Sequence, residues 1–168
     1  MLFQGKQKMD ESKPYTLEEA QREFARSTNG QVWELLQKED RSPAENELMI
    51  HAAHASCYHW INVGTGVHHQ RGEWLLAHVY AELGMAQPAL WHATRCQELT
   101  DEFPELMKDF DRAYAFESLA RAAALAKNRE QALKYLKLAE DAGNIIANSE
   151  DKSIFWGDFN SGNWYGIK

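Results

Sequence analysis

Apolar residues recur at helical spacing along most of the chain. Leu76, Tyr80 and Leu83, for example, fall on one stripe of a helix. No window shows the sustained alternation of apolar and polar residues that marks a strand. Proline lacks the amide hydrogen that a helix interior needs, and each proline stands where a helix would start or stop. The prolines are Pro14, Pro43, Pro88 and Pro104. The pattern predicts an all-α protein.

Capping and breaking residues divide the chain into about six helices. Thr16 is a suitable cap for the first, in which Asn29-Gly30 is a candidate break. Ser42, with Pro43 after it and Glu45 three residues later, is a suitable cap for the second. The predicted helices span residues 16–38, 43–63, 71–83, 88–100, 111–126 and 129–146. The sequence VGTGVHHQ, residues 63–70, is predicted to be a linker.

Two predicted helix pairs share one plan at a constant offset of 43 residues. The repeat aligns Leu76-Ala77 with Leu119-Ala120, and Ala89-Leu90 with Ala132-Leu133. With Tyr80 and Gly84 in the first unit, residues 70–147 resemble the tetratricopeptide repeat (TPR) family. The second unit departs from that pattern, because Ala123 replaces the tyrosine and Lys127-Asn128 the turn glycine. The resemblance implies a right-handed stack of antiparallel helix hairpins.

The TPR resemblance also implies a ligand-binding concave surface. It places six residues there: Arg71, Trp74, His78, Tyr114, Glu117 and Arg121. Arginine forks, an indole and an imidazole suit a peptide or protein segment that carries an anionic group or a C-terminal carboxylate. The alternative is that Glu117 and Arg121 form an ordinary ion pair one turn apart and that Trp74 only packs.

The stretch HAAHASCYHW, residues 51–60, offers a second kind of chemistry. Glu47, His51 and His54 share one helical face and could supply part of a metal site. The alternatives are a polar seam between helices and exposure to solvent. A small-molecule or metal site, even an enzymatic one, could also form between helices from His51, His54, His78, Glu117 and Arg121. No catalytic motif is present, and we expect a non-enzymatic protein without a cofactor.

Charge and cysteine content narrow the class of protein. A net charge of -7 disfavours nucleic acid as a partner, since such binding requires lysines and arginines that neutralise phosphates. No apolar run approaches the ~18 residues of a membrane-spanning helix. Cys57 and Cys96 form no CxxC pair, and no secretory leader is evident. These features predict a cytoplasmic protein with free thiols and no membrane partner.

The two ends differ from the rest of the chain. LFQG, residues 2–5, resembles the core of a tag-removal protease site, and residues 1–14 are predicted to be a disordered, partly tag-derived arm. Residues 15–168 are predicted to be a single helical domain. Its aromatic tail, residues 148–168, looks too irregular for a long helix. Either it caps the end of the stack, or it docks into the groove or onto a second copy as a homodimer.

Overall fold

The computed structural model describes residues 14–168, which form seven α-helices and no strand. The helices are α1 (Leu17–Leu36), α2 (Pro43–Val63), α3 (Gly66–Glu82), α4 (Ala86–Glu102), α5 (Asp109–Leu125), α6 (Arg129–Asn144) and α7 (Ser149–Phe159). The all-α prediction is therefore confirmed. The predicted arm, residues 1–14, lies outside the described residues except for Pro14.

Reciprocal capping boxes start the first two helices, as the sequence predicts. Thr16 Oγ1 accepts a hydrogen bond from the Glu19 amide, and the Glu19 carboxylate accepts one from the Thr16 amide. Ser42 and Glu45 repeat this arrangement at the start of α2. Each box satisfies amide hydrogens that have no partner within the helix, and loss of such a cap typically costs about 1 kcal/mol.

Two expected interruptions are absent. Helix α1 passes through Asn29-Gly30 without a break. The packing of its buried residues, such as Val32 and Leu35, outweighs the low helix propensity of one glycine. The predicted linker is also wrong, because α3 begins at Gly66 rather than Arg71. His68 Nδ1 accepts a hydrogen bond from the Thr65 amide at 3.1 Å, the role that glutamate plays in the other two boxes. His68 and His69 therefore lie on a helix.

The C-terminal tail contains a seventh helix rather than an irregular segment alone. Asn148 Oδ1 caps α7 by accepting from the amides of Glu150 and Asp151, both at 2.9 Å. Beyond α7 the chain folds back onto this helix, and Lys168 Nζ donates to the Phe159 carbonyl at 2.9 Å. Three aromatic side chains of the tail are buried in a cluster with residues of α5 and α6, and these are Phe155, Phe159 and Trp164.

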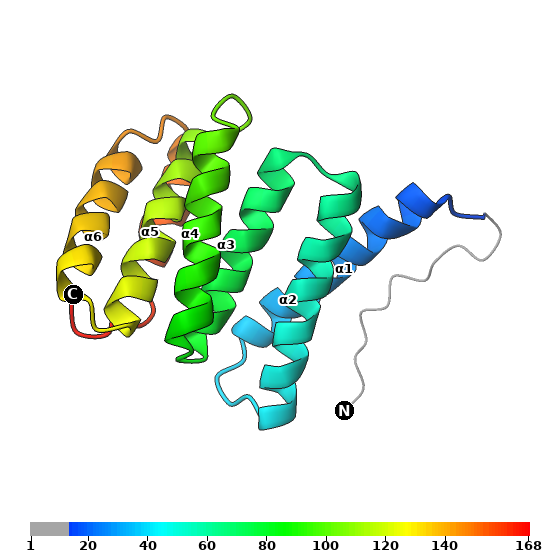
Figure 1. Cartoon of the computed structure of the whole chain (residues 1–168), viewed down its shortest axis with the longest axis horizontal. Helices are drawn as coiled ribbons and strands as arrows, with labels where there is room; N and C mark the ends of the chain where they lie inside the picture. Colours follow the sequence, from blue (N-terminus) through cyan, green and yellow to red (C-terminus); the bar gives the residue numbers. More distant parts are fainter. Residues whose placement is uncertain (1–13) are drawn as a thin grey trace.

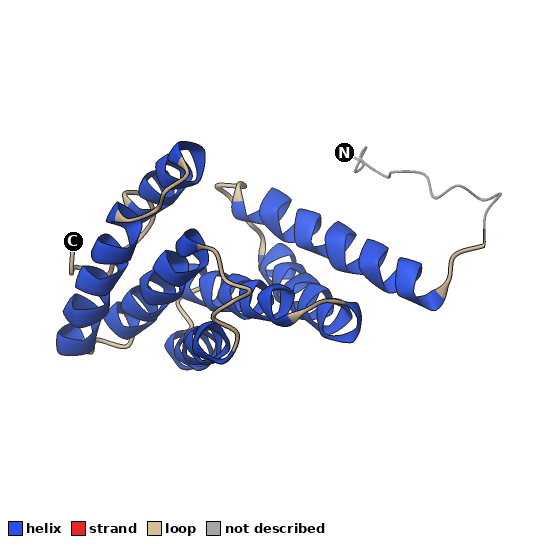
Figure 2. Cartoon of the chain, turned by 90° about the horizontal axis from the view of Figure 1, so that it is seen from above, coloured by secondary structure: helices blue, strands red, loops and turns tan. Residues whose placement is uncertain are grey.

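Neighbouring helices pack in chain order. Figure 1 shows α1 to α6 following one another across the molecule, and Figure 2 shows short loops between the helices. Helix α3 also contacts α5, and α7 packs on α5 and α6. Small side chains allow the close approach of α3, α4 and α5, where Ala77, Ala89, Ala93 and Ala122 are buried together. This order places α1, α3, α5 and α7 around a common groove.

Two further properties concern the whole described chain. None of the helices within residues 14–168 is long and apolar enough to cross a membrane. Cys57 and Cys96 are both buried free thiols.

Candidate functional site

A groove lies where α1, α3, α5 and α7 face one another. Its larger compartment has a volume of about 330 Å³. The main lining side chains are Trp33, Arg71, Trp74, Phe110, Tyr114, Ile154 and Asp158, with Gln70 and Asp111 beneath them. A smaller compartment of about 160 Å³ is lined by Trp33, Trp74, His78, Glu117, Arg121 and Asp158, together with tail residues 161–163 and Tyr165. The compartments share Trp33, Trp74 and Asp158, and together we call them the aromatic groove.

All six residues that the TPR resemblance points to line this groove. Arg71 and Tyr114 are in the larger compartment, and His78, Glu117 and Arg121 are in the smaller one. Trp74 borders both. The sequence did not single out Trp33 and Asp158 as site residues, because helices distant in sequence bring them there.

Trp74 is the centre of the aromatic wall. Its ring stacks on Trp33 with centroids 6.0 Å apart and on His78 at 5.4 Å, while Tyr114 meets it edge-on at 5.1 Å. Its indole nitrogen is 3.5 Å from a carboxylate oxygen of Glu117. Such contacts fix the ring orientations, so the wall is formed before any ligand arrives.

Arg71 is held at the rim by a buried carboxylate. Its Nε and Nη2 donate to the two oxygens of Asp111 at 2.8 and 3.0 Å. The guanidinium also lies over the Phe110 ring, 5.1 Å from its centroid. The side chain is still 46% exposed, but its fork already holds a carboxylate.

Arg121 is fully engaged inside the protein. Its Nε donates to Glu117, which confirms an ion pair one turn apart on α5. Its Nη atoms donate to the carbonyl oxygens of Asp158, Ser161 and Asn163 at 2.9 to 3.1 Å. The guanidinium also lies over the Trp164 ring, 4.1 Å from its centroid. The tail thus uses the donors that would otherwise receive an anionic ligand.

Two acceptor side chains belong to the larger compartment, Gln70 at its base and Asp158 at its side. The Gln70 side chain is buried, and its Nε2 donates to Thr100 Oγ1 at 3.1 Å and to the Asp111 carbonyl at 3.3 Å. Its Oε1 has no hydrogen-bond partner among residues 14–168. Asp158 accepts a 2.6 Å hydrogen bond from Tyr114 but has no lysine or arginine ion-pair partner among the described residues. The larger compartment therefore contains one carboxylate without a cationic partner among the described residues and, at its base, a buried amide oxygen without a hydrogen bond.

His78 adds no positive charge at neutral pH. Burial lowers the pKa of His78, an effect that nearby Glu117 opposes and Arg121 reinforces. Its imidazole is thus mainly neutral above pH 6.5 and acts as a stacking partner for Trp74.

The residues Glu47, His51 and His54 do not converge on one point. His51 Nε2 is 4.0 Å from Glu47 Oε1, with both side chains about three-quarters exposed. His54 Nε2 lies instead 2.8 Å from the Tyr80 hydroxyl on α3. His54 thus contacts a neighbouring helix, as the seam interpretation expects, whereas His51 and Glu47 are exposed to solvent, as the other alternative expects.

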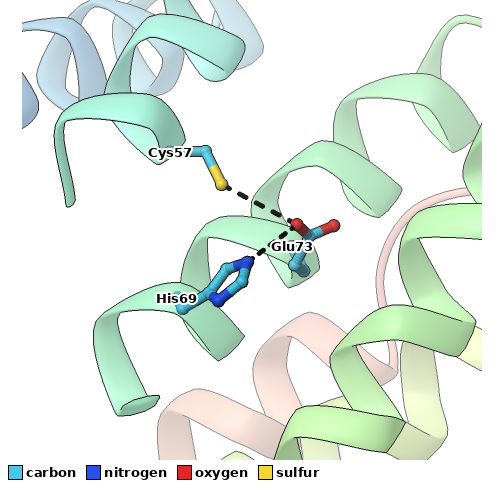
Figure 3. Close-up of side chains that lie close together, drawn as sticks. All are labelled: Cys57, His69 and Glu73. Carbon is cyan, nitrogen blue, oxygen red and sulfur yellow. Dashed lines mark hydrogen bonds and ion pairs between the residues drawn. The ribbon is translucent and has the colours of Figure 1, made fainter. Parts of the chain in front are cut away.

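A different set of metal-ligating side chains does converge. Cys57 Sγ, a ring nitrogen of His69 and a carboxylate oxygen of Glu73 all lie within 4.8 Å of one another (Figure 3). Glu73 Oε1 is 3.3 Å from His69 Nε2 and 3.9 Å from Cys57 Sγ. The other carboxylate oxygen, Oε2, accepts a 2.7 Å hydrogen bond from His92 Nδ1. We call these four residues the Glu73 cluster.

Sequence reasoning missed the Glu73 cluster because it placed His69 in a linker. A helix start at Gly66 would have shown His69 and Glu73 one turn apart, an i,i+4 pair on one face. Cys57 and His92 could not have been added, since they come from α2 and α4.

Cys57 is not an activated nucleophile in this arrangement. Burial, reinforced by the Glu73 carboxylate, raises the pKa of Cys57 to about 12. A reactive cysteine needs the opposite, a pKa lowered toward neutral pH. The thiol is therefore protonated and directs its hydrogen toward Glu73.

The groove and the Glu73 cluster lie on different faces of α3, which supplies Arg71 and Trp74 to one and His69 and Glu73 to the other. Each combines side chains from at least three helices.

In comparisons with known proteins, no protein family, no curated protein and no solved structure matches the chain.

Proposed function

We propose that the chain is a TPR-like interaction module that binds a segment of a peptide or another protein in the aromatic groove. The 43-residue repeat supports the TPR-like stack, because α3 and α4 begin at Gly66 and Ala86, and α5 and α6 begin at Asp109 and Arg129. The groove lies between alternate helices, where the TPR resemblance expects a ligand. Two buried free thiols, Cys57 and Cys96, support a cytoplasmic location.

The observation that carries the proposal is the larger compartment itself. It combines about 330 Å³ of space, an aromatic wall around Trp74, the buried acceptor Gln70 Oε1 and the carboxylate of Asp158. An aromatic wall attracts a cation over the ring faces, and the Asp158 carboxylate, which has no lysine or arginine partner among the described residues, attracts a cation as well. The ligand that fits is a lysine or arginine side chain presented by an extended segment.

This chemistry differs from the anionic ligand that the sequence suggests. Arg71 already holds Asp111, and Arg121 holds Glu117 and the tail. An incoming carboxylate would have to displace one of these carboxylates and would also approach Asp158. A basic segment meets no such competition.

Binding of short synthetic peptides tests the proposal. Two fluorescent pools, identical except for a central lysine or glutamate, are titrated with the protein. The lysine pool should bind, and Trp74→Ala should weaken its affinity at least ~tenfold, since loss of an aromatic anchor commonly exceeds about 1.4 kcal/mol. Trp91→Ala is the matched control, because Trp91 is exposed and lies outside the groove lining. Equal binding of both pools, or no effect of Trp74→Ala, would rule the proposal out.

The homodimer stays a prediction. The rings of Phe155, Phe159 and Trp164 are buried against α5 and α6 of their own chain, so they do not need a second copy to cover them. Light scattering of the purified protein at micromolar concentration distinguishes a monomer from a dimer.

A further inference from the structure

We propose that Cys57, His69 and Glu73 form a binding site for one divalent transition-metal ion, with zinc as the best-fitting ion. The site bridges α2 and α3, and it is separate from the aromatic groove. It goes beyond peptide binding and does not depend on it.

The spacing of the three side chains suits zinc. Ligand atoms around a tetrahedral zinc ion lie roughly 3.3 to 3.6 Å apart, because the bonds are ~2.0 to 2.3 Å long. Glu73 Oε1 is already 3.3 Å from His69 Nε2 and 3.9 Å from Cys57 Sγ. Small side-chain rotations would bring all three onto one ion, as the convergent orientation in Figure 3 illustrates.

The ligand types select among metals. A thiolate, an imidazole and a carboxylate together suit zinc and its cobalt substitute, whereas magnesium and calcium prefer oxygen ligands alone. Three protein ligands leave a fourth coordination position for water or another group.

His92 is a positioning residue for this site. Its Nδ1 donates to Glu73 Oε2 at 2.7 Å, since a carboxylate can only accept. The His92 ring is itself stacked on Tyr80, with centroids 5.5 Å apart, and meets Trp91 edge-on. Such outer contacts hold a ligating carboxylate in one orientation.

The charge environment of Glu73 distinguishes it from other buried carboxylates. Asp111 and Glu117 each hold an arginine, whereas the ion-pair partners of Glu73 within the described chain are two histidines. Glu73 is only 5% exposed, so an uncompensated negative charge there is unfavourable. Metal binding would release the thiol proton that Cys57 now directs at Oε1, and His69 would bind through Nε2 as a neutral imidazole with its one ring hydrogen on Nδ1.

The local packing allows an ion to enter. His69 is 27% exposed in its side chain and forms the rim of the site, while Cys57 and Glu73 form its base. Helix α3 approaches Cys57 closely because residue 72 is glycine, and a Cβ there would lie 2.9 Å from Cys57 Sγ. The ion would thus join helices that already touch.

Titration of the full chain with zinc and with cobalt tests the proposal. After treatment with a chelator and its removal, calorimetry should show one zinc ion per chain, and cobalt should produce the near-ultraviolet charge-transfer absorption of a cobalt–thiolate bond. Cys57→Ser should abolish that absorption, whereas Cys96→Ser, at the other buried cysteine, should keep it.

The histidine ligand has its own matched control. His69→Ala should weaken zinc binding by at least ~tenfold, while His51→Ala, an exposed histidine on α2, should leave it unchanged. Circular dichroism establishes that each variant keeps its helices. If a variant unfolds, the cobalt absorption of the unsubstituted protein still tests whether a cobalt–thiolate bond forms. Absence of that absorption at equimolar cobalt, or zinc binding that depends on His51 and not on His69, would overturn the proposal.

Discussion

The two faces of α3 deal with buried charge in opposite ways. On the groove face, Arg71 holds Asp111, and the neighbouring Arg121 of α5 holds Glu117, so each carboxylate is matched by a permanent cation. On the other face, Glu73 contacts a thiol and two imidazoles and has no arginine or lysine partner among the described residues. The first arrangement builds a fixed wall for a ligand. The second suits reversible binding of a metal ion.

The largest expected effect on stability concerns the groove face of α3. Arg121→Met should lower the free energy of unfolding by about 3–5 kcal/mol, because it leaves Glu117 buried without its partner. Urea denaturation measures the change. Arg22→Met is the control, since its pair with Glu18 is exposed and should contribute only ~0.2–1 kcal/mol. If both variants lost the same free energy of unfolding, the buried Arg121–Glu117 pair would contribute no more than the exposed pair.

The stability of the Glu73 cluster should depend on metal binding instead. Zinc at about 100 times its dissociation constant should stabilise the protein by ~2.7 kcal/mol if it binds only the folded chain. Thermal unfolding with and without zinc measures this gain, which His69→Ala should remove. A zinc effect that survives this substitution would place the ion elsewhere.

Two glycines provide a steric test of the close approach behind the Glu73 cluster. Gly72→Ala should destabilise the protein by about 1–3 kcal/mol, because the new methyl group would press on Cys57. Gly30→Ala should stabilise it by roughly 0.5–1 kcal/mol, since a Cβ at this helical position meets nothing within 4 Å. Chemical denaturation of the pair checks both signs. Destabilisation by both variants would mean that helix geometry, not contact with Cys57, is responsible.

Histidines produce the smallest expected effect, a dependence on pH. Burial lowers the pKa of His54, His68 and His78 from 6.5, so the folded chain binds fewer protons than the unfolded chain. Their stability contribution is complete above pH 6.5 and is lost as pH falls through their folded pKa values. Melting temperatures between pH 5 and 8 should show this decline, and His78→Gln should reduce its slope. An unchanged slope would remove His78 from the explanation.

Much of the groove could be predicted from local patterns. The caps at Thr16 and Ser42 are encoded within four residues, and the TPR resemblance implied that Trp74 and Tyr114 share one surface. What could not be predicted depends on contacts distant in sequence. Arg121 is engaged by tail carbonyls 37 to 42 residues away, and no local pattern indicates that its donors are taken.

The Glu73 cluster was not predicted, because one helix start was not recognised and two of its residues come from other helices. His68 caps α3 in the position where glutamate is usual, so the helix start was not recognised. Cys57 then had to arrive from α2 and His92 from α4, which only the packed structure reveals.

One crossed binding experiment tests most directly whether α3 carries two independent sites. Trp74→Ala and His69→Ala are each titrated with zinc and with the lysine peptide pool by calorimetry. We predict that Trp74→Ala keeps zinc and loses the peptides, and that His69→Ala does the reverse. Loss of both ligands in a variant that remains helical would contradict two independent sites, and retention of both ligands in either variant would contradict the site that carries the substitution.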